Sequence, residues 1–197
     1  RTMAMDPVLS DRRKQAMRAA GFWSDQTLLE VFSKNARNDP GRIAVVGYED
    51  ASNRRTALTY GELQQTADRI AANLLRLGAS PGEVVSYQLP NWWQFVALHL
   101  ALLRIGAVTN PVMPIFRDRE MEFMLTLAET RVLIVPQRFR DFDHAAMADR
   151  LKAKVPTLEH IVVIGSGDDR DFEAVLNAPG KRVEAATAAS ADDVVQL

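Results

Sequence analysis

Apolar residues recur at helical spacing in the middle of the chain and then give way to short, continuous apolar runs. Intervals of four and three residues predict one buried face of a helix, formed by Leu63, Ala67, Ile70, Leu74 and Leu77. Thr59 and Glu62 lie three residues apart just before this face. This spacing is typical of a capping box, so we expect the helix to begin there.

The alternation of helical and continuous apolar segments extends to residue 164. Apolar runs rich in β-branched residues predict strands at residues 84–89, 107–109, 132–135 and 161–164, with helices at residues 92–105, 118–128 and 139–151 between them. Strands that alternate with helices are joined by right-handed crossovers into a parallel sheet that helices cover on both faces. The sequence therefore predicts an α/β fold with a doubly wound, mostly parallel sheet.

The N-terminal part predicts helices and a hairpin before this sheet. Residues 10–20 predict a polar helix ended by Gly21, and a second capping box at Thr27 and Glu30 opens another helix. Residues 43–46 and 56–58 predict the two strands of a hairpin.

The C-terminal part is different again. Residues 165–190 are rich in Ala, Gly and Asp and predict a surface linker, with a short helix near residues 172–176. An apolar strand follows at the end of the chain. We therefore divide the chain into an N-terminal helical segment (1–40), an α/β sheet subdomain (41–165) and a linker with a strand (166–197).

The composition excludes several classes of function. The formal net charge is -1, so no overall field favours nucleic acid or an anionic membrane. The absence of cysteine excludes disulfides, thiolate metal sites and a cysteine nucleophile. The longest apolar stretch, residues 95–103, contains His99 and is too short to span a bilayer. The N-terminal residues contain no signal-peptide core, and we expect a cytoplasmic protein without a transmembrane segment.

Two patterns that often mark a site have a simpler explanation here. The three histidines, His99, His144 and His160, are far apart and lack metal-ligand spacing, so no metal site is predicted. His99 lies within an apolar helix, where we expect a hydrogen-bonded core residue. Trp92 and Trp93 stand at a helix start, where packing is favoured over contact with a ligand.

The glycines after the last predicted sheet strand are a weak signal for a phosphate loop. Gly165 and Gly167 follow a strand, but Arg170 occupies the third glycine position of the dinucleotide-binding motif. Asp168 and Asp171 would repel a phosphate, and an exposed turn leading into a helix fits them better.

The loop at residues 110–117 (NPVMPIFR) is the strongest local candidate for function. It leaves the carboxyl end of a predicted parallel strand, where ligands bind in open α/β sheets. Pro111 and Pro114 stiffen it, and Arg117 is able to hold an anion. A rigid connector with Arg117 capping the next helix or paired to Glu120 explains the loop equally well, and both interpretations remain open.

Three segments together resemble the adenylate-forming superfamily of acyl-CoA synthetases. Residues 58–63 (LTYGEL) match the family's L-T-Y-x-E-L pattern. Residues 101–108 (ALLRIGAV), with Asn110, Pro111 and Pro114, match its helix, glycine, short strand and proline loop. Residues 192–197 (DDVVQL) look like the lead-in to its phosphate-binding loop.

The resemblance implies a two-step reaction in the parent protein. A carboxylate attacks the α-phosphate of ATP with Mg²⁺ neutralising charge, and the CoA thiol then displaces AMP to give a thioester. In the family the phosphate loop and the catalytic lysine come later in the chain, so we expect this fragment to be inactive and to bind no ATP, Mg²⁺ or CoA. The resemblance implies no catalytic and no metal-binding residue here, and it makes Phe116 and Arg117 candidates for the edge of the CoA or acyl channel.

The opening of the chain, from residues 7–10 (PVLS) through residues 21–23 (GFW) to residues 28–29 (LL), is similar to CoA ligases for medium-chain fatty acids and alicyclic acids such as cyclohexanecarboxylate. Residues 107–112 (AVTNPV) depart from the pattern of amino-acid-activating members. The expected partners are a small carboxylic acid and CoA, without nucleic acid, and a surface left uncovered in a fragment predicts a homo-oligomer.

Three alternative functions remain open. Within the family, the chain is alternatively part of an adenylation domain that feeds a carrier protein, or of an adenylating oxygenase. Outside it, the chain is a stand-alone α/β binding module without catalysis. A receiver domain is disfavoured, because residues 88–91 (QLPN) offer no carboxylate for Mg²⁺ at the end of the first parallel strand.

Overall fold

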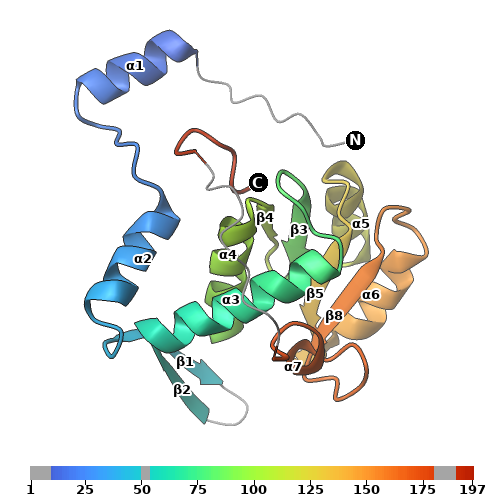
Figure 1. Ribbon diagram of the computed structural model, residues 1–197. Helices are drawn as coiled ribbons and strands as arrows, with labels where there is room; N and C mark the ends of the chain where they lie inside the picture. The colour runs from blue at the N-terminus through green and yellow to red at the C-terminus, as the bar shows by residue number, and fades with distance from the viewer. Residues whose placement is uncertain (1–9, 50–53, 180–189) are drawn as a thin grey trace.

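A four-stranded parallel sheet forms the centre of the molecule. The computed structural model describes residues 10–49, 54–179 and 190–197. The sheet strands are β3 (Val84–Tyr87), β4 (Val108–Pro111), β5 (Val132–Pro136) and β8 (His160–Ile164). Their order is β4-β3-β5-β8, and every neighbouring pair is parallel (Figure 1). The predicted α/β class and parallel sheet are confirmed.

Helices cover both faces of this sheet. They are α3 (Tyr60–Arg76), α4 (Trp93–Ile105) and the short α7 (Phe172–Val175) on one face, and α5 (Asp118–Leu127) and α6 (His144–Lys152) on the other. Alternate residues of β5 point to opposite layers: Val132 and Ile134 join the α3/α4 core, whereas Leu133 and Val135 join the α5/α6 core. A strand buried on both faces must be apolar throughout, which explains its continuous apolar run.

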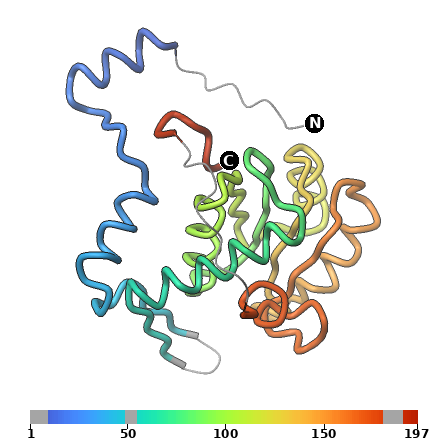
Figure 2. Tube along the Cα trace, in the orientation of Figure 1, coloured from blue at the N-terminus to red at the C-terminus, as the bar shows by residue number. Residues whose placement is uncertain are grey.

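The N-terminal part lies along one side of this sheet domain. It consists of α1 (Asp11–Ala19), α2 (Leu28–Asn38) and an antiparallel hairpin of β1 (Ile43–Glu49) and β2 (Arg54–Thr59). In Figure 2 the blue trace of α1 and α2 runs beside the sheet domain. Helix α1 buries no residue, and Arg18 connects it to Asp192 through a 2.7 Å ion pair.

Both predicted capping boxes are present. The Thr59 amide donates to Glu62 Oε2 at 2.8 Å, and the Glu62 amide donates to Thr59 Oγ1 at 3.2 Å. Thr27 and Glu30 repeat this geometry at the start of α2. Four residues of the predicted face of α3 are buried (Leu63, Ala67, Ile70 and Leu74), and Leu77 is partly buried at its end.

The last residues of the chain lie beside β4. The Thr109 amide donates to the Val195 carbonyl, and the Leu197 amide donates to the Thr109 carbonyl, both at 2.9 Å. These bonds form a parallel bridge between Thr109 and Gln196. The predicted C-terminal strand is therefore seen as a single bridge on the free edge of β4.

One predicted helix begins later than its apolar pattern indicated. Residues 139–151 were expected to be helical, but residues 138–143 form a small hairpin of β6 (Arg138–Phe139) and β7 (Phe142–Asp143). The prediction of helix from residue 139 is wrong because Phe139 and Phe142 face each other across this hairpin. Asp143 then caps α6 by accepting a 2.9 Å hydrogen bond from the Ala146 amide.

Candidate functional site

A cleft opens at the carboxyl ends of the parallel strands. The loop after β3 leads to α4 on one face, whereas the loops after β4 and β5 lead to α5 and α6 on the other. Loops that diverge to opposite faces leave a crevice, which is where open α/β sheets bind ligands. The cleft measures about 620 Å³ and is lined by Leu89, Pro90, Asn91, Pro114, Ile115, Arg117, Phe139, Arg140, Asp141 and Phe142.

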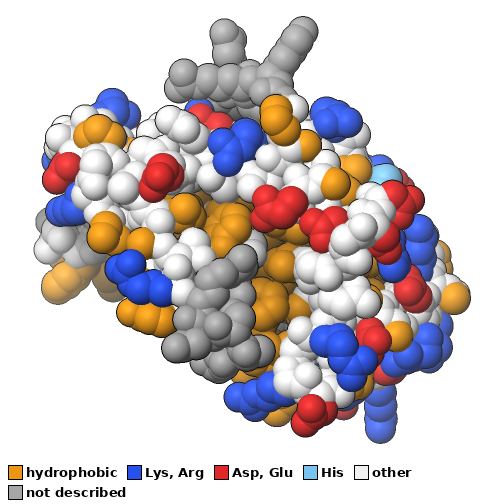
Figure 3. Space-filling view, turned by 90° about the horizontal axis from the view of Figure 1, so that it is seen from below, with side chains coloured by type: hydrophobic (Ala, Val, Ile, Leu, Met, Phe, Trp, Pro, Cys, Tyr) orange, Lys and Arg blue, Asp and Glu red, His pale blue; other side chains and the backbone are white. Residues whose placement is uncertain are grey.

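The side of the molecule at which the strands end is rich in apolar surface. Figure 3 looks toward this side, and hydrophobic side chains gather in a hollow in its middle, with charged side chains around it. In the described residues the loop after β4 exposes two large apolar side chains, with Met113 56% and Ile115 69% exposed. Apolar surface with charged side chains at its rim is typical of a ligand-binding cleft.

Two arginines supply the positive charge of the cleft. The guanidinium of Arg117 lies 3.9 Å from the ring centre of Phe142, and that of Arg140 lies 5.3 Å from the ring centre of Phe139. Stacking on an aromatic face fixes the plane of a guanidinium while leaving its edge able to donate hydrogen bonds. The cleft therefore has two oriented cations on its wall.

Arg117 makes the contacts expected of a rigid connector and also lines the cleft. Its Nη1 donates to the carbonyls of Pro114 at 2.7 Å and Phe116 at 3.0 Å, and its amide donates to Glu120 Oε2 at 3.2 Å. These bonds are those of a rigid connector and a helix start. The side chain nevertheless lines the cleft. The side chain of Phe116, by contrast, packs against the α5/α6 core.

Two buried polar residues beneath the loop were not predicted as part of a site. The Gln88 side chain donates from Nε2 to the carbonyls of Met113 at 2.9 Å and Phe116 at 3.0 Å. Its Oε1 lies 3.0 Å from His144 Nδ1, and both side chains are fully buried. A signal was available in the sequence, because a polar residue at the end of an apolar buried strand requires hydrogen-bond partners.

Burial keeps His144 neutral. Desolvation, followed by the nearby charge of Arg117, lowers the pKa of His144 to about 4, against the opposing charge of Asp143. The Gln88 amide group uses its nitrogen for the two carbonyls, so its oxygen accepts and His144 Nδ1 carries the proton. The hydrogen bond thus assigns the tautomer of the ring.

The other sequence candidates have structural roles. His99 is partly buried, and its Nδ1 lies 3.0 Å from the hydroxyl oxygen of buried Tyr87, which agrees with the expected hydrogen bond. Trp92 and Trp93 pack edge-on against Phe139 and Phe172, respectively, so the packing interpretation is favoured.

In the loop after β8, aspartate carboxylates accept hydrogen bonds from other residues of the same loop. The Gly167 amide donates to Asp171 Oδ2 at 3.0 Å, and Ser166 Oγ donates to Asp168 Oδ1 at 2.7 Å. Asp171 also accepts from the Glu173 amide at the start of α7. These contacts fit the exposed turn and helix start rather than a phosphate loop. Among the residues described, no group of three or more His, Cys, Asp or Glu side chains is placed to hold a metal ion.

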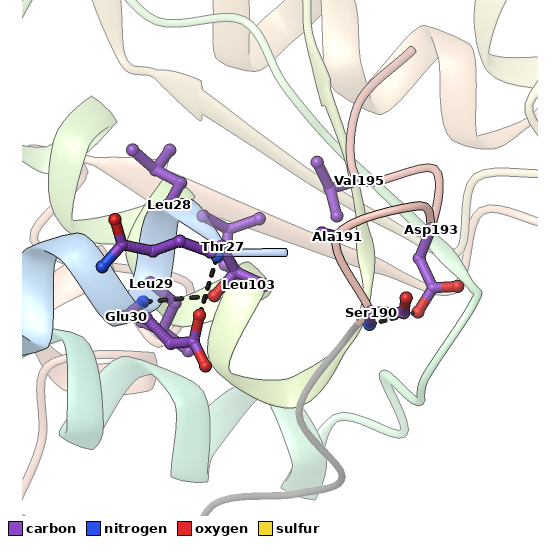
Figure 4. A pocket seen from close by; sticks show the side chains of 10 residues that line it. Thr27, Leu28, Leu29, Glu30, Leu103, Ser190, Ala191, Asp193 and Val195 are labelled. Atoms are coloured by element: carbon purple, nitrogen blue, oxygen red, sulfur yellow. Dashed lines mark hydrogen bonds between the residues drawn. The ribbon is translucent and has the colours of Figure 1, made fainter. Parts of the chain in front are cut away.

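A second, smaller pocket lies between α2, α4 and the C-terminal segment. It measures about 180 Å³ and is lined by Gln26, Thr27, Leu28, Leu29, Glu30, Leu103, Ser190, Ala191, Asp193 and Val195. Figure 4 shows the Thr27–Glu30 capping box on one side of this space and Val195 and Asp193 on the other. Its walls are mostly apolar, and Thr27 bonds with Glu30 and Ser190 with Asp193 within their own segments.

Comparison with known proteins places this chain in one family. Residues 32–197 match the model of the family described as AMP-binding enzyme. The chain belongs to this family, whose members include the adenylate-forming ligases.

The curated relatives include ligases named for different acceptors. Over 155 residues, or 78% of this chain, the sequence is 42% identical to the salicyl-AMP ligase / salicyl-S-ArCP synthetase of Mycobacterium tuberculosis. Over 160 residues, or 81% of this chain, it is 31% identical to the medium-chain fatty-acid–CoA ligase of Escherichia coli. The match covers 27% of each of these relatives, so the chain spans about a quarter of their length.

Solved structures agree with the fold. The apo structure of Mycobacterium smegmatis MbtA superposes with a TM-score of 0.76 at 35% identity, over 91% of this chain and 32% of that one. The acetoacetyl-CoA synthetase of Streptomyces lividans superposes with a TM-score of 0.68 at 28% identity, over 79% of this chain and 25% of that one.

In the described part of this chain, no helix is both long and apolar enough to cross a membrane.

Proposed function

We propose that this chain is the N-terminal part of an ATP-dependent ligase that activates a carboxylic acid and transfers its acyl group to a thiol. Membership of the AMP-binding enzyme family carries the proposal. In the first step a carboxylate oxygen attacks the α-phosphorus of ATP and pyrophosphate leaves. In the second step the thiol sulfur attacks the acyl carbon, AMP leaves and the thiol proton is released.

The contribution of this chain is one wall of the ligand channel. Arg117 would face the anionic group of the acid or of CoA, while Ile115 and the ring of Phe142 would contact its apolar part. Phe116 contributes through its backbone, whose carbonyl holds the loop together. The described residues include no acidic cluster that fits Mg²⁺, and we assign the metal no position on this chain.

The substrate class and the thiol are the finer part of the proposal. Aryl acids deserve the first test, because the relative at 42% identity is named a salicyl-AMP ligase. A medium-chain or alicyclic acid is the second candidate, supported by the relative at 31% identity. We propose CoA as the acceptor, and a carrier protein is the alternative that the name of the first relative favours.

The test uses the full-length protein with ATP, Mg²⁺ and a panel of aryl, alicyclic, short-chain and medium-chain acids. Acid-dependent exchange of pyrophosphate into ATP measures the first step, and mass spectrometry of products with CoA measures the second. A thioester with one class of acid would support the CoA ligase and identify its substrate. Adenylate without a CoA thioester would favour the carrier-protein alternative, and no adenylate with any acid would overturn the proposal in favour of a binding module.

A further inference from the structure

Gln88 is placed so that it serves two backbone carbonyls and one side chain at the same time. It follows directly after β3, and its own amide donates to the Ile134 carbonyl at 2.9 Å, which continues the hydrogen bonding between β3 and β5. Its side chain is fully buried. With both Nε2 protons donated and Oε1 accepting from His144, the amide group is locked in one orientation.

The loop that lines the cleft depends on these side-chain donors. Residues 112–117 contain neither helix nor strand, and backbone amides reach two of their carbonyls: Phe116 donates to Met113 at 3.3 Å and Met121 to Arg117 at 2.9 Å. Met113 and Phe116 accept from Gln88, while Pro114 and again Phe116 accept from Arg117. A buried carbonyl without a partner is costly. Gln88 therefore holds the carbonyls of Met113 and Phe116 toward the interior, while the side chains of Met113 and Ile115 remain exposed.

His144 supports the same loop from below. Its ring donates to Gln88 and packs edge-on against Phe142, with ring centres 4.9 Å apart. Phe142 in turn carries the guanidinium of Arg117 at 3.9 Å. One histidine at the start of α6 thus reaches the loop by two routes, through Gln88 to its carbonyls and through Phe142 to its arginine.

We propose that Gln88 and His144 are positioning residues that hold residues 112–117 in the conformation that binds the ligand of the cleft. They do not line the cleft and so act through the loop. Their loss is expected to weaken binding of the acid or CoA while leaving the chemical step nearly unchanged. This kinetic expectation rests on the proposed ligase function, whereas the ordering of the loop does not.

The experiment compares variants of the full-length protein. Gln88→Met keeps the size of the side chain and removes all three hydrogen bonds, and His144→Leu removes the donor to Gln88. His144→Gln keeps an amide donor at the same place and is the rescue variant. Gln94→Met is the matched control, because Gln94 is also buried and its Oε1 has no hydrogen-bond partner. Hydrogen exchange of a peptide covering residues 112–120 and steady-state kinetics are measured for each.

In Gln88→Met and His144→Leu, we expect about tenfold faster exchange in this peptide and a KM raised about tenfold, with kcat within about twofold. His144→Gln should return both values toward wild type, and Gln94→Met should change neither. Unchanged exchange and KM in folded Gln88→Met or His144→Leu protein would overturn the proposal, as would an equal effect of Gln94→Met. If Gln88→Met does not fold, the His144→Leu and His144→Gln pair decides the question alone. If the wild type activates no acid, the ligase proposal fails, and the exchange rates alone confirm or overturn the positioning role.

Discussion

Arg104 on α4 lies with its Nε 2.9 Å from Oδ1 of Asp68 on α3, and each side chain is only 12% exposed. The two helices form the layer that covers one face of the sheet. The pair therefore joins the two helices at a place where little water screens the charges.

Removing one partner of this pair should destabilise the protein more than removing both. In Asp68→Leu the guanidinium remains buried without its partner, and we expect the free energy of unfolding to fall by about 2–4 kcal/mol. The double variant Asp68→Leu/Arg104→Met replaces both charges by apolar groups and should recover most of that loss. Urea unfolding of the four proteins of this cycle measures the effect. A double variant as unstable as the sum of its single variants would contradict the coupling.

The low pKa of His144 makes stability depend on pH in a defined window. Above the ordinary pKa of 6.5 the ring is neutral in both the folded and unfolded states. As the pH falls from 6.5 to about 4, the His144 ring binds a proton in the unfolded chain but stays neutral in the folded protein. We expect this difference to remove up to about 3 kcal/mol of stability by pH 4, with no further loss from this group below that pH.

His144→Gln should abolish this part of the pH dependence. His99 also has a lowered pKa because of its burial and contributes with the same sign, so the difference between wild type and variant isolates His144. Urea unfolding at intervals from pH 7 to pH 4 measures it. Parallel stability curves for the two proteins over this range would show that the proton on His144 has no part in acid destabilisation.

Local sequence chemistry predicted most of the fold but little of the site. Thr59 and Glu62 identify a helix start because both groups belong to one turn of chain. The hairpin before α6 was missed because Phe139 fits the apolar pattern of a helix. The structure instead pairs Phe139 with Phe142 across a hairpin, and apolar periodicity carries no information on such pairing. Arg117 was found as a candidate because its loop follows a strand.

The support beneath the cleft could not be read from sequence spacing. Gln88 and His144 are 56 positions apart. They meet because β3 and β5 are neighbours in the sheet although β4 lies between them in the chain. Neither apolar periodicity nor capping patterns predict the order of strands in the sheet, because that order depends on which strands pair with each other.

The two capping boxes should differ in their effect on stability although their geometry is the same. Thr59→Ala removes the acceptor for the Glu62 amide at the start of α3, whose inner face is buried in the core, and should lower the free energy of unfolding by about 1 kcal/mol. Thr27→Ala removes the equivalent cap from α2, which buries only Ala36 among its described residues. We expect that variant to increase local hydrogen exchange in α2 and to leave the urea midpoint nearly unchanged. Equal shifts of the midpoint in both variants would contradict this difference.

Substitutions of Arg117 and Arg140 distinguish the effect of the positive charge of the cleft from the effect of the order of its loop. Both guanidinium groups line the cleft and stack on a phenylalanine, but only that of Arg117 also bonds to the carbonyls of residues 114 and 116. In the full-length protein, Arg117→Ala should therefore raise the KM for the anionic ligand by about tenfold, through loss of both charge and loop order. Arg140→Ala removes charge alone and should raise it less.

Arg117→Lys completes this comparison, because lysine keeps the charge but lacks the planar guanidinium that stacks on Phe142 and positions Nη1 against the two carbonyls. A KM close to that of Arg117→Ala would assign the effect to loop order, and a KM close to wild type would assign it to charge. Steady-state kinetics with the acid and with the thiol varied in turn would show which of the two ligands passes this wall. If all three variants keep the wild-type KM for both ligands, Arg117 does not lie at the edge of the channel, and its role is limited to connecting β4 to α5.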